Sequence, residues 1–237
     1  GYALRLGMCQ VKGVGEDDAE WLIAARGNGY YDPVSIWRRA DVGAPALEKL
    51  AQADAFASMG LSRRDALWAI KPLRRSMSPL PLFAAAGAAE LGEEPAVSLP
   101  RMTLGEEVVE DYASLRLTLR AHPLQLLRHR LHGTIPAARL QETADGAKNV
   151  VVAGLVLVRQ RPGTAKGVIF LTLEDETGVS NVIVWPHVLE RYRRVVLAAR
   201  LTRVTGVLQR EGIVTHLVAE ELEDMSHMLD DLGGEEG

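Results

Sequence analysis

Few residues in this 237-residue sequence have the types and spacing that catalysis requires. Two pairs of adjacent carboxylates, Asp17-Asp18 and Asp230-Asp231, are the groups that a two-metal site would use. Neither pair lies on a β-hairpin that would hold two ions, because one stands at a predicted helix start and the other in an acidic tail. We interpret both pairs as solvated charge and predict no catalytic residue.

Histidine and cysteine give no metal pattern either. His129 and His132 have helical spacing and His122 is near, but no Cys or carboxylate completes a zinc site. Cys9 has no evident His base and is predicted to be a small core residue. We therefore predict no metal site, and a lone cysteine excludes a disulfide within the chain.

A glycine pair near the start has the pattern of a phosphate-binding turn. Lys12, Gly13, Val14 and Gly15 precede a predicted helix over Glu16–Arg26. Glycine permits a sharp turn, and the free N–H groups and dipole of the following helix attract phosphate. This favours a helix-hairpin-helix motif that grips the DNA backbone, over a plain glycine turn. The acids at 16–18 would oppose phosphate if they faced it.

The segment Leu47–Ile70 is equally compatible with a second, degenerate hairpin and with a plain pair of helices joined by a glycine turn. Predicted helices run over Ala46–Phe56 and onward from Ser62, where Ser62 and Asp65 form a capping box. Arg63 and Arg64 stand beside the intervening glycine turn and become candidate DNA contacts.

The last third of the chain changes to a β pattern. Five β-rich runs, with a helical run at His187–Ala198 between the third and fourth, have the order of an OB barrel. The runs are Val150–Gln160, Gly167–Glu174, Val179–Trp185, Arg200–Gln209 and Ile213–Ala219. The predicted fold class is α+β multidomain, with an N-terminal helix-hairpin-helix region, a helical linker and a C-terminal five-stranded OB barrel.

One face of this barrel is predicted to bind a single strand. Alternation points Phe170 and Thr172 outward, and Asn181 and Trp185 share that face. Aromatic side chains on this face of OB folds stack bases. Basic residues flank it, from the loop after the first strand and from the fourth strand: Arg159, Arg161, Lys166 and Arg203. The alternative is a barrel used for packing or for protein contact.

Charge is distributed unevenly, which matters more than the formal net charge of −4. Residues 148–210 hold ten Lys and Arg against four Asp and Glu, whereas residues 211–237 hold nine acids and no base. The predicted organisation is a hairpin region over 1–75, a Pro/Ala-rich linker with helices over 76–147, the OB domain over 148–224 and an acidic tail over 225–237. The absence of a leader or a long apolar run, together with the lone cysteine, favours the cytoplasm and no membrane contact.

The sequence resembles the C-terminal third of bacterial C-family DNA polymerases, the class of the replicative polymerase III α subunit, and most of all its error-prone homologues. The resemblance covers nearly the whole chain, and the barrel segments are the most specific. The segments that carry it are 4–7, 10–15, 50–56, 121–124, 159–168, 172–178, 181–186 and 208–212.

The resemblance implies a parent DNA-directed DNA polymerase that uses Mg²⁺ and acts in translesion synthesis and induced mutagenesis. Its catalytic aspartates would precede Gly1, so no catalytic residue and no cofactor is expected in this chain. The hairpins would hold primer–template duplex, and the barrel single-stranded template. The acidic end, in place of a clamp-loader-binding domain, favours the error-prone branch.

A clamp-binding motif of the replicative relatives has a partial match at Leu80, Leu82 and Phe83. Pro79 replaces the glutamine of that motif, which argues against binding to the sliding clamp. Another hypothesis is a protein-interaction module that docks the polymerase to accessory mutagenesis proteins. A third hypothesis, the anticodon-binding barrel of a tRNA enzyme, fits the β-rich part of the sequence but not the hairpin region.

Overall fold

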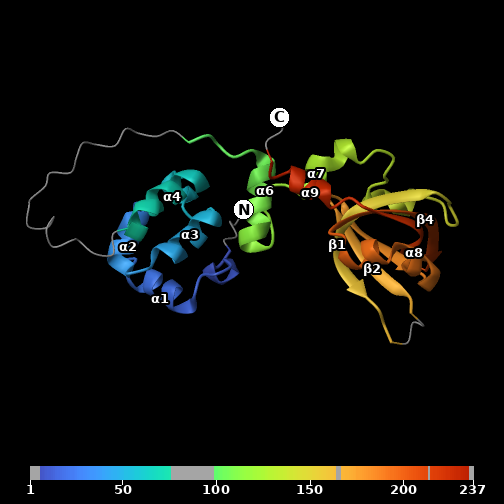
Figure 1. The fold of residues 1–237 in the computed structure, drawn as a ribbon, viewed down its shortest axis with the longest axis horizontal. Coiled ribbons are helices and arrows are strands. Elements are labelled where there is room, and N and C mark those ends of the chain that lie inside the picture. The colour runs from blue at the N-terminus through green and yellow to red at the C-terminus, as the bar shows by residue number, and fades with distance from the viewer. Residues whose placement is uncertain (1–5, 76–98, 164–166, 213, 235–237) are drawn as a thin grey trace, which may run out of the picture. The chain divides into compact units, whose positions relative to one another are not determined.

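The computed structural model describes residues 6–75, 99–163, 167–212 and 214–234. It divides into two compact units, residues 1–103 with 109–118, and residues 104–108 with 119–237. The first is helical and the second contains the barrel (Figure 1). The clamp-motif-like residues Leu80, Leu82 and Phe83, and the loop residue Lys166, lie outside the described residues.

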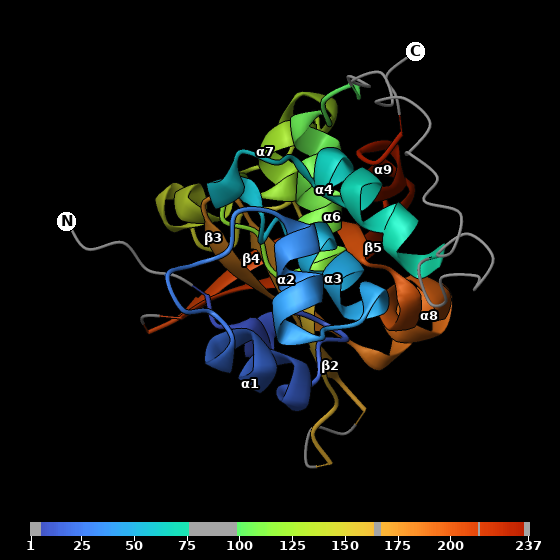
Figure 2. The ribbon, with the colours of Figure 1, turned by 90° about the vertical axis from the view of Figure 1, so that its left-hand side faces the viewer.

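The first unit is a cluster of short helices around one apolar core (Figure 2). Its helices are α1 (Glu16–Ala24), α2 (Pro33–Ala40), α3 (Ala44–Gln52), α4 (Arg63–Ile70) and most of α6 (Leu104–Leu115), with 3-10 turns at Met8–Gln10, Ala57–Met59 and Lys71–Arg75. The capping box predicted for α4 is present, because Ser62 accepts from the Asp65 N–H and Asp65 from the Ser62 N–H.

Helix α2 was not expected from the sequence. Asp32 caps it by accepting a hydrogen bond from the Ser35 N–H, and Pro33 occupies its first turn, where the missing N–H costs nothing. Ile36 and Ala40 then face the core. The cap and the proline were the signals available in the sequence.

The second unit is built on a closed five-stranded barrel. Its strands are β1 (Val150–Gln160), β2 (Ile169–Asp175), β3 (Gly178–Val184), β4 (Leu201–Glu211) and β5 (Val214–Asp224), in the order β1-β2-β3-β5-β4. Pairing of β1 with β4 closes the barrel, and only the β3–β5 pair is parallel. Helix α8 (Pro186–Ala198) joins β3 to β4, as an OB fold requires.

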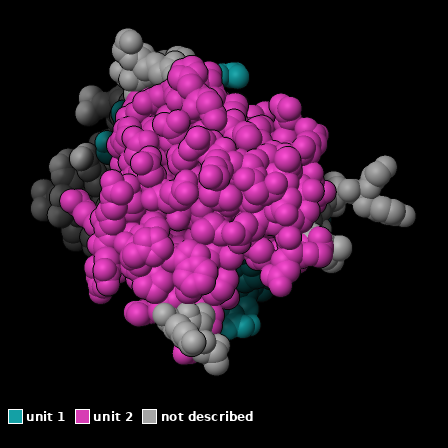
Figure 3. Space-filling view, turned by 90° about the vertical axis from the view of Figure 1, so that its right-hand side faces the viewer, with its two compact units in different colours: residues 1–103, 109–118 teal, residues 104–108, 119–237 magenta. Residues whose placement is uncertain are grey.

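Alternation along the strands fills the barrel with aliphatic side chains. Ile169, Leu171 and Leu173 of β2 point inward, as predicted, and Val182 and Val184 of β3 meet them. Gly206 of β4 permits a close approach of two strands, because a Cβ there would lie 2.0 Å from the carbonyl oxygen of Val218. Figure 3 shows the packed surface of this unit.

The ends of the barrel domain differ from the sequence expectation. Strand β5 extends to Asp224, because Leu222 still points into the core between exposed acids. Residues predicted as an acidic tail form helix α9 (His227–Asp231), and Met228 is buried with residues of helix α7 (Pro123–Leu127). The remaining 3-10 turns lie at Arg128–Arg130 and Ala137–Glu142.

Candidate nucleic-acid interface

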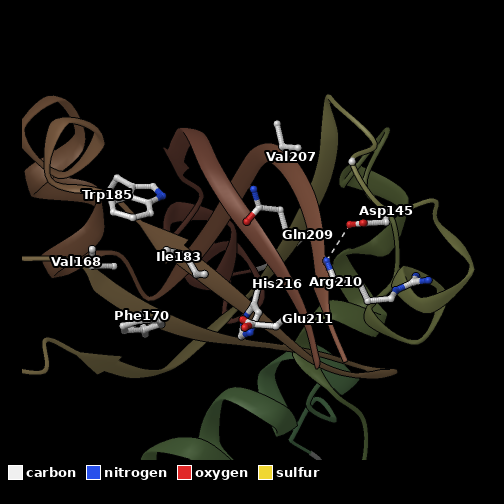
Figure 4. Close-up of a pocket in the computed structure, with 11 residues that line it drawn as sticks. Asp145, Val168, Phe170, Ile183, Trp185, Val207, Gln209, Arg210, Glu211 and His216 are labelled. Carbon is white, nitrogen blue, oxygen red and sulfur yellow. Dashed lines mark hydrogen bonds between the residues drawn. The ribbon is translucent and has the colours of Figure 1, made fainter. Parts of the chain in front are cut away.

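An open groove of about 900 Å³ crosses the outer face of the barrel (Figure 4). It is lined by β2, β3, β4, β5 and the loop that precedes β1. The lining residues are Asp145, Gly146, Val168, Phe170, Ile183, Trp185, Val207, Gln209, Arg210, Glu211 and His216. Apolar side chains gather at the end near Trp185, and polar ones toward Asp145 (Figure 4).

The predicted aromatic residues lie in this groove. Phe170 and Trp185 both line it, and Trp185 is 47% exposed at the start of α8. Thr172 and Asn181 are Cα partners on the same outward face but are not among the lining residues. The structure therefore brings together two of the four face residues that the alternation selected and places the other two beside them.

The basic residues around the barrel have different surroundings. Arg161 is exposed, and its guanidinium is 3.6 Å from the position of a Cβ on Gly167, at the groove end near Trp185. Arg159 donates hydrogen bonds to the carbonyls of Val196 and Ala199 and so closes the end of α8, but these neutral partners leave its charge in place. Its role as a DNA contact stays a prediction.

Arg203 is also held by the protein. It lies 3.6 Å from a carboxylate oxygen of Glu223, and the buried Nε has no hydrogen-bond partner among the described atoms. Arg203 does not line the groove, and its role as a DNA contact stays a prediction.

The hairpin of the first unit has the predicted turn. Gly13 has a φ of +87°, which only glycine adopts without strain, and Gly15 is the N-cap residue of α1. The Lys12 N–H donates to the Ser114 carbonyl, which fixes the turn, and the Lys12 side chain is exposed. Lys49 of α3 packs its side chain 3.5 Å from a Cβ position on Gly13, a second basic residue that the sequence did not indicate.

Arg63 is structural, which corrects its assignment as a DNA contact. Its side chain is only 2% exposed, pairs with Asp111 of α6 and donates to the Gln52 carbonyl. Arg64 is half-buried and donates to the Pro100 carbonyl at 2.9 Å. Arg63 is therefore closed to DNA, whereas the contact predicted for Arg64 stays a prediction.

The segment Thr172–Gly178, one of those that carry the resemblance, has a structural centre in Asp175. Its Oδ1 accepts from both the N–H and the hydroxyl of Thr177, and its Oδ2 accepts from the Ala137 N–H at 2.8 Å. Burial alone would raise the pKa of Asp175, but these hydrogen bonds and the charge of Arg128 lower it overall. The carboxylate thus fixes the turn between β2 and β3.

His122 also has a structural role. Its Nδ1 accepts from the Leu124 N–H at the start of α7. Burial lowers the pKa of His122, against the opposing charges of Glu174, Glu176 and Asp175. The neutral imidazole is therefore the form that caps this helix.

Other chemistry-bearing residues do not assemble into a site. Within the described ranges, no three His, Cys, Asp or Glu side chains are placed to hold a metal ion. Asp230 and Asp231 pair with Arg200 and Arg130, so they are not simply solvated. Cys9 is exposed, which corrects its prediction as a core residue.

Sequence reasoning missed a basic helix face. Helix α8 exposes Arg191, Arg193 and Arg194, none of which forms an ion pair within 4.0 Å among the described residues. Arg191 stacks over the Tyr192 ring at 5.2 Å. The signal was present as the excess of basic residues over 148–210.

Comparison with known families agrees with both units. Residues 1–66 match the helix-hairpin-helix motif, and residues 150–225 match the OB-fold nucleic acid binding domain. No helix of the described part is both long and apolar enough to cross a membrane.

Curated relatives extend the comparison over the whole chain. The chain is 60% identical to the error-prone DNA polymerase of Ruegeria pomeroyi, over 98% of this chain and 21% of that protein. It is 48% and 49% identical to error-prone DNA polymerases 1 and 2 of Rhizobium meliloti, over 96% and 100% of its length and 21% and 22% of theirs. The chain is therefore homologous, along nearly all its length, to about one fifth of error-prone DNA polymerases, and it contains a helix-hairpin-helix region and an OB fold.

Proposed function

We propose that this chain is the DNA-binding part of an error-prone DNA-directed DNA polymerase that acts in translesion synthesis and damage-induced mutagenesis in the bacterial cytoplasm. The observation that carries the proposal is the open groove with Phe170 and Trp185 on its apolar side. Exposed aromatic rings in such a groove stack unpaired bases. The barrel then holds single-stranded template, with Arg161 at the groove end near Trp185 as a phosphate contact.

The hairpin is proposed to hold the duplex backbone. Lys12 is exposed, and the Lys49 stem packs beside the Gly13 turn, so two ammonium groups flank one backbone site. Glu16 and Asp17 are exposed in the first turn of α1 and repel phosphate from that side. We therefore assign the contact to the lysine side of the turn, where it adds affinity without base specificity.

Nucleotide addition itself is assigned to other parts of the parent polymerase. In this proposal the catalytic aspartates and Mg²⁺ act outside this chain, whose described residues provide no metal cluster. The contribution of the chain is to position template and duplex, which raises the fraction of productive encounters.

A protein-interaction module is the second candidate, and a specific observation favours it. Several arginines that would attract DNA bind carbonyl groups of the chain instead, including Arg159 and Arg210. On this hypothesis the barrel docks accessory mutagenesis proteins. Salt separates the two candidates, because each phosphate contact makes DNA affinity fall steeply as salt rises.

The test is fluorescence anisotropy of labelled single-stranded and primer–template DNA across a salt series. Phe170→Ala and the double variant Arg161→Ala/Lys166→Ala are expected to weaken single-strand binding, and Lys12→Ala to weaken primer–template binding. Loss of one phosphate contact lowers the salt slope by about 1. Arg139→Ala is the matched control, because it removes one exposed charge that is paired with Glu142.

Absence of salt-sensitive binding by the folded wild-type chain at low salt would refute DNA handling by this chain. The interaction module would then become the first candidate.

A further inference from the structure

Two rows of outward side chains cross the barrel face side by side. Cα pairing joins Phe170 to Ile183, Ile183 to Val218 and Val218 to Val207, which makes an apolar row across four strands. The same pairings join a polar row two residues along each strand: Thr172, Asn181, His216 and Gln209. Residues two apart on a strand lie roughly 7 Å from each other, so the rows are close neighbours.

The polar row has unused hydrogen-bonding capacity. None of its four side chains hydrogen-bonds to any residue that the structure describes, and because the Nδ1 of His216 is buried, a ligand can meet only the other nitrogen of that ring. A hydroxyl, two side-chain amides and an imidazole offer donors and acceptors together. Neutral groups of this kind bind base edges, whereas phosphate contacts come mainly from cations.

The two ends of the groove differ in charge. Arg161 lies near Gly167 and Pro186, at the end that Trp185 lines. Asp145 and Glu211 line the groove toward the other end. Arg210 also lines the groove there, and its guanidinium donates to the carbonyls of Gln141 and Thr143, which does not cancel its charge. A phosphate chain is therefore attracted at the Trp185 end and repelled by the carboxylates.

We infer that the polar row recognises base edges, so that the groove selects among single-stranded sequences. This inference rests on the proposed function and adds a specificity to it. Bases lie over the apolar row, their edges reach Gln209 and His216, and the phosphates follow the side of Arg161. Gln209 and His216 are the two members of the polar row that line the groove.

The division of roles gives opposite signatures to two kinds of variant. Loss of an amide or imidazole changes the relative affinity for different bases but leaves the number of phosphate contacts unchanged. Loss of Arg161 lowers affinity for every sequence by a similar factor and reduces the salt slope by about 1. A merely structural role for either residue would produce neither pattern.

The experiment measures anisotropy of short dA, dC and dT strands with the full chain. For the wild type we expect affinities that differ by about tenfold between the best and the worst strand, as a base-specific contact provides. Gln209→Ala and His216→Ala should each reduce this ratio toward one at an unchanged salt slope, whereas Arg161→Ala should keep the ratio. His216→Asn provides a polar substitution if His216→Ala lowers the melting temperature.

The outcomes distinguish failure of this inference from failure of the proposed DNA-binding function. Tight wild-type binding with equal affinities, or a ratio unchanged by Gln209→Ala and by both His216 variants, overturns base recognition and leaves DNA binding intact. No single-strand binding by the folded wild type overturns both.

Discussion

Replacing Asp175 by alanine tests the structural role assigned to the segment Thr172–Gly178. The carboxylate accepts five hydrogen bonds, from Thr177, Gly178, Ala137 and Arg128. Its side chain is 3% exposed, so water cannot replace these partners without opening the turn. Asp175→Ala is therefore expected to destabilise the barrel and not to act through DNA contact.

The size of this loss of stability follows from the hydrogen-bond partners that Asp175→Ala leaves behind. The buried N–H of Ala137 loses its acceptor, which costs about 1–3 kcal/mol, and each bond that closes the β2–β3 turn contributes about 0.5–1.5 kcal/mol. Arg128 keeps its pair with Glu176, so its partly exposed charge adds little. The expected loss of stability is on the order of 4 kcal/mol.

Urea unfolding, monitored through the hydrogen exchange of amides in β2 and β3, measures this loss of stability within the barrel unit alone. Because the pKa of Asp175 is lowered in the folded state, its stabilisation is present above the unfolded value near 3.8 and is lost as the pH falls through the folded value. The gap in unfolding free energy between wild type and variant must therefore become smaller at acidic pH. Glu190→Ala, at an exposed carboxylate of α8, is the control. A gap below about 1 kcal/mol, or one that does not change with pH, would refute the account.

Three further predictions concern the fold. Arg63→Ala should lower the stability of the helical unit by about 3–5 kcal/mol, because it removes the guanidinium that pairs with the buried carboxylate of Asp111. An unchanged urea midpoint would contradict this. Gly206→Ala should cost about 1–3 kcal/mol, because the new Cβ would overlap the Val218 carbonyl; an unaltered melting temperature would show that the strands can separate there. The lowered pKa of His122 means that its stabilisation is present above the unfolded value of 6.5 and lost as the pH falls through the folded value. His122→Gln should remove this component of the pH dependence, and an identical pH profile for both proteins would disprove the assignment.

The barrel face was predictable because strand alternation is a local signal. A period of two assigns inside and outside without knowledge of any partner strand, and it placed Phe170 and Trp185 correctly on the outer face. The hairpin turn was predictable for the same reason, since the φ of Gly13 is a property of one residue. Helix α2 was missed although its capping signal, Asp32 before Pro33, is equally local.

The fate of individual arginines was not predictable in this way. Arg63 is buried because Asp111, 48 residues away, meets it in the core. Arg159 is held by carbonyls at the end of α8, almost 40 residues further along the chain. These partners are set by tertiary packing, so a count of basic residues cannot distinguish a cation that faces solvent from one that bonds to the backbone.

The same packing bears on the acidic net charge. Several carboxylates that contribute to it, such as Asp111 and Asp230, are paired with arginines, and each such pair is nearly neutral from a distance. Screening at physiological salt reduces what remains beyond about 8 Å. A phosphate that approaches the barrel therefore responds to the nearest charges of the groove, Arg161 at one end and, toward the other, Arg210 with the two carboxylates of Asp145 and Glu211. The local difference between these ends, and not the total charge of the chain, determines how a strand can lie.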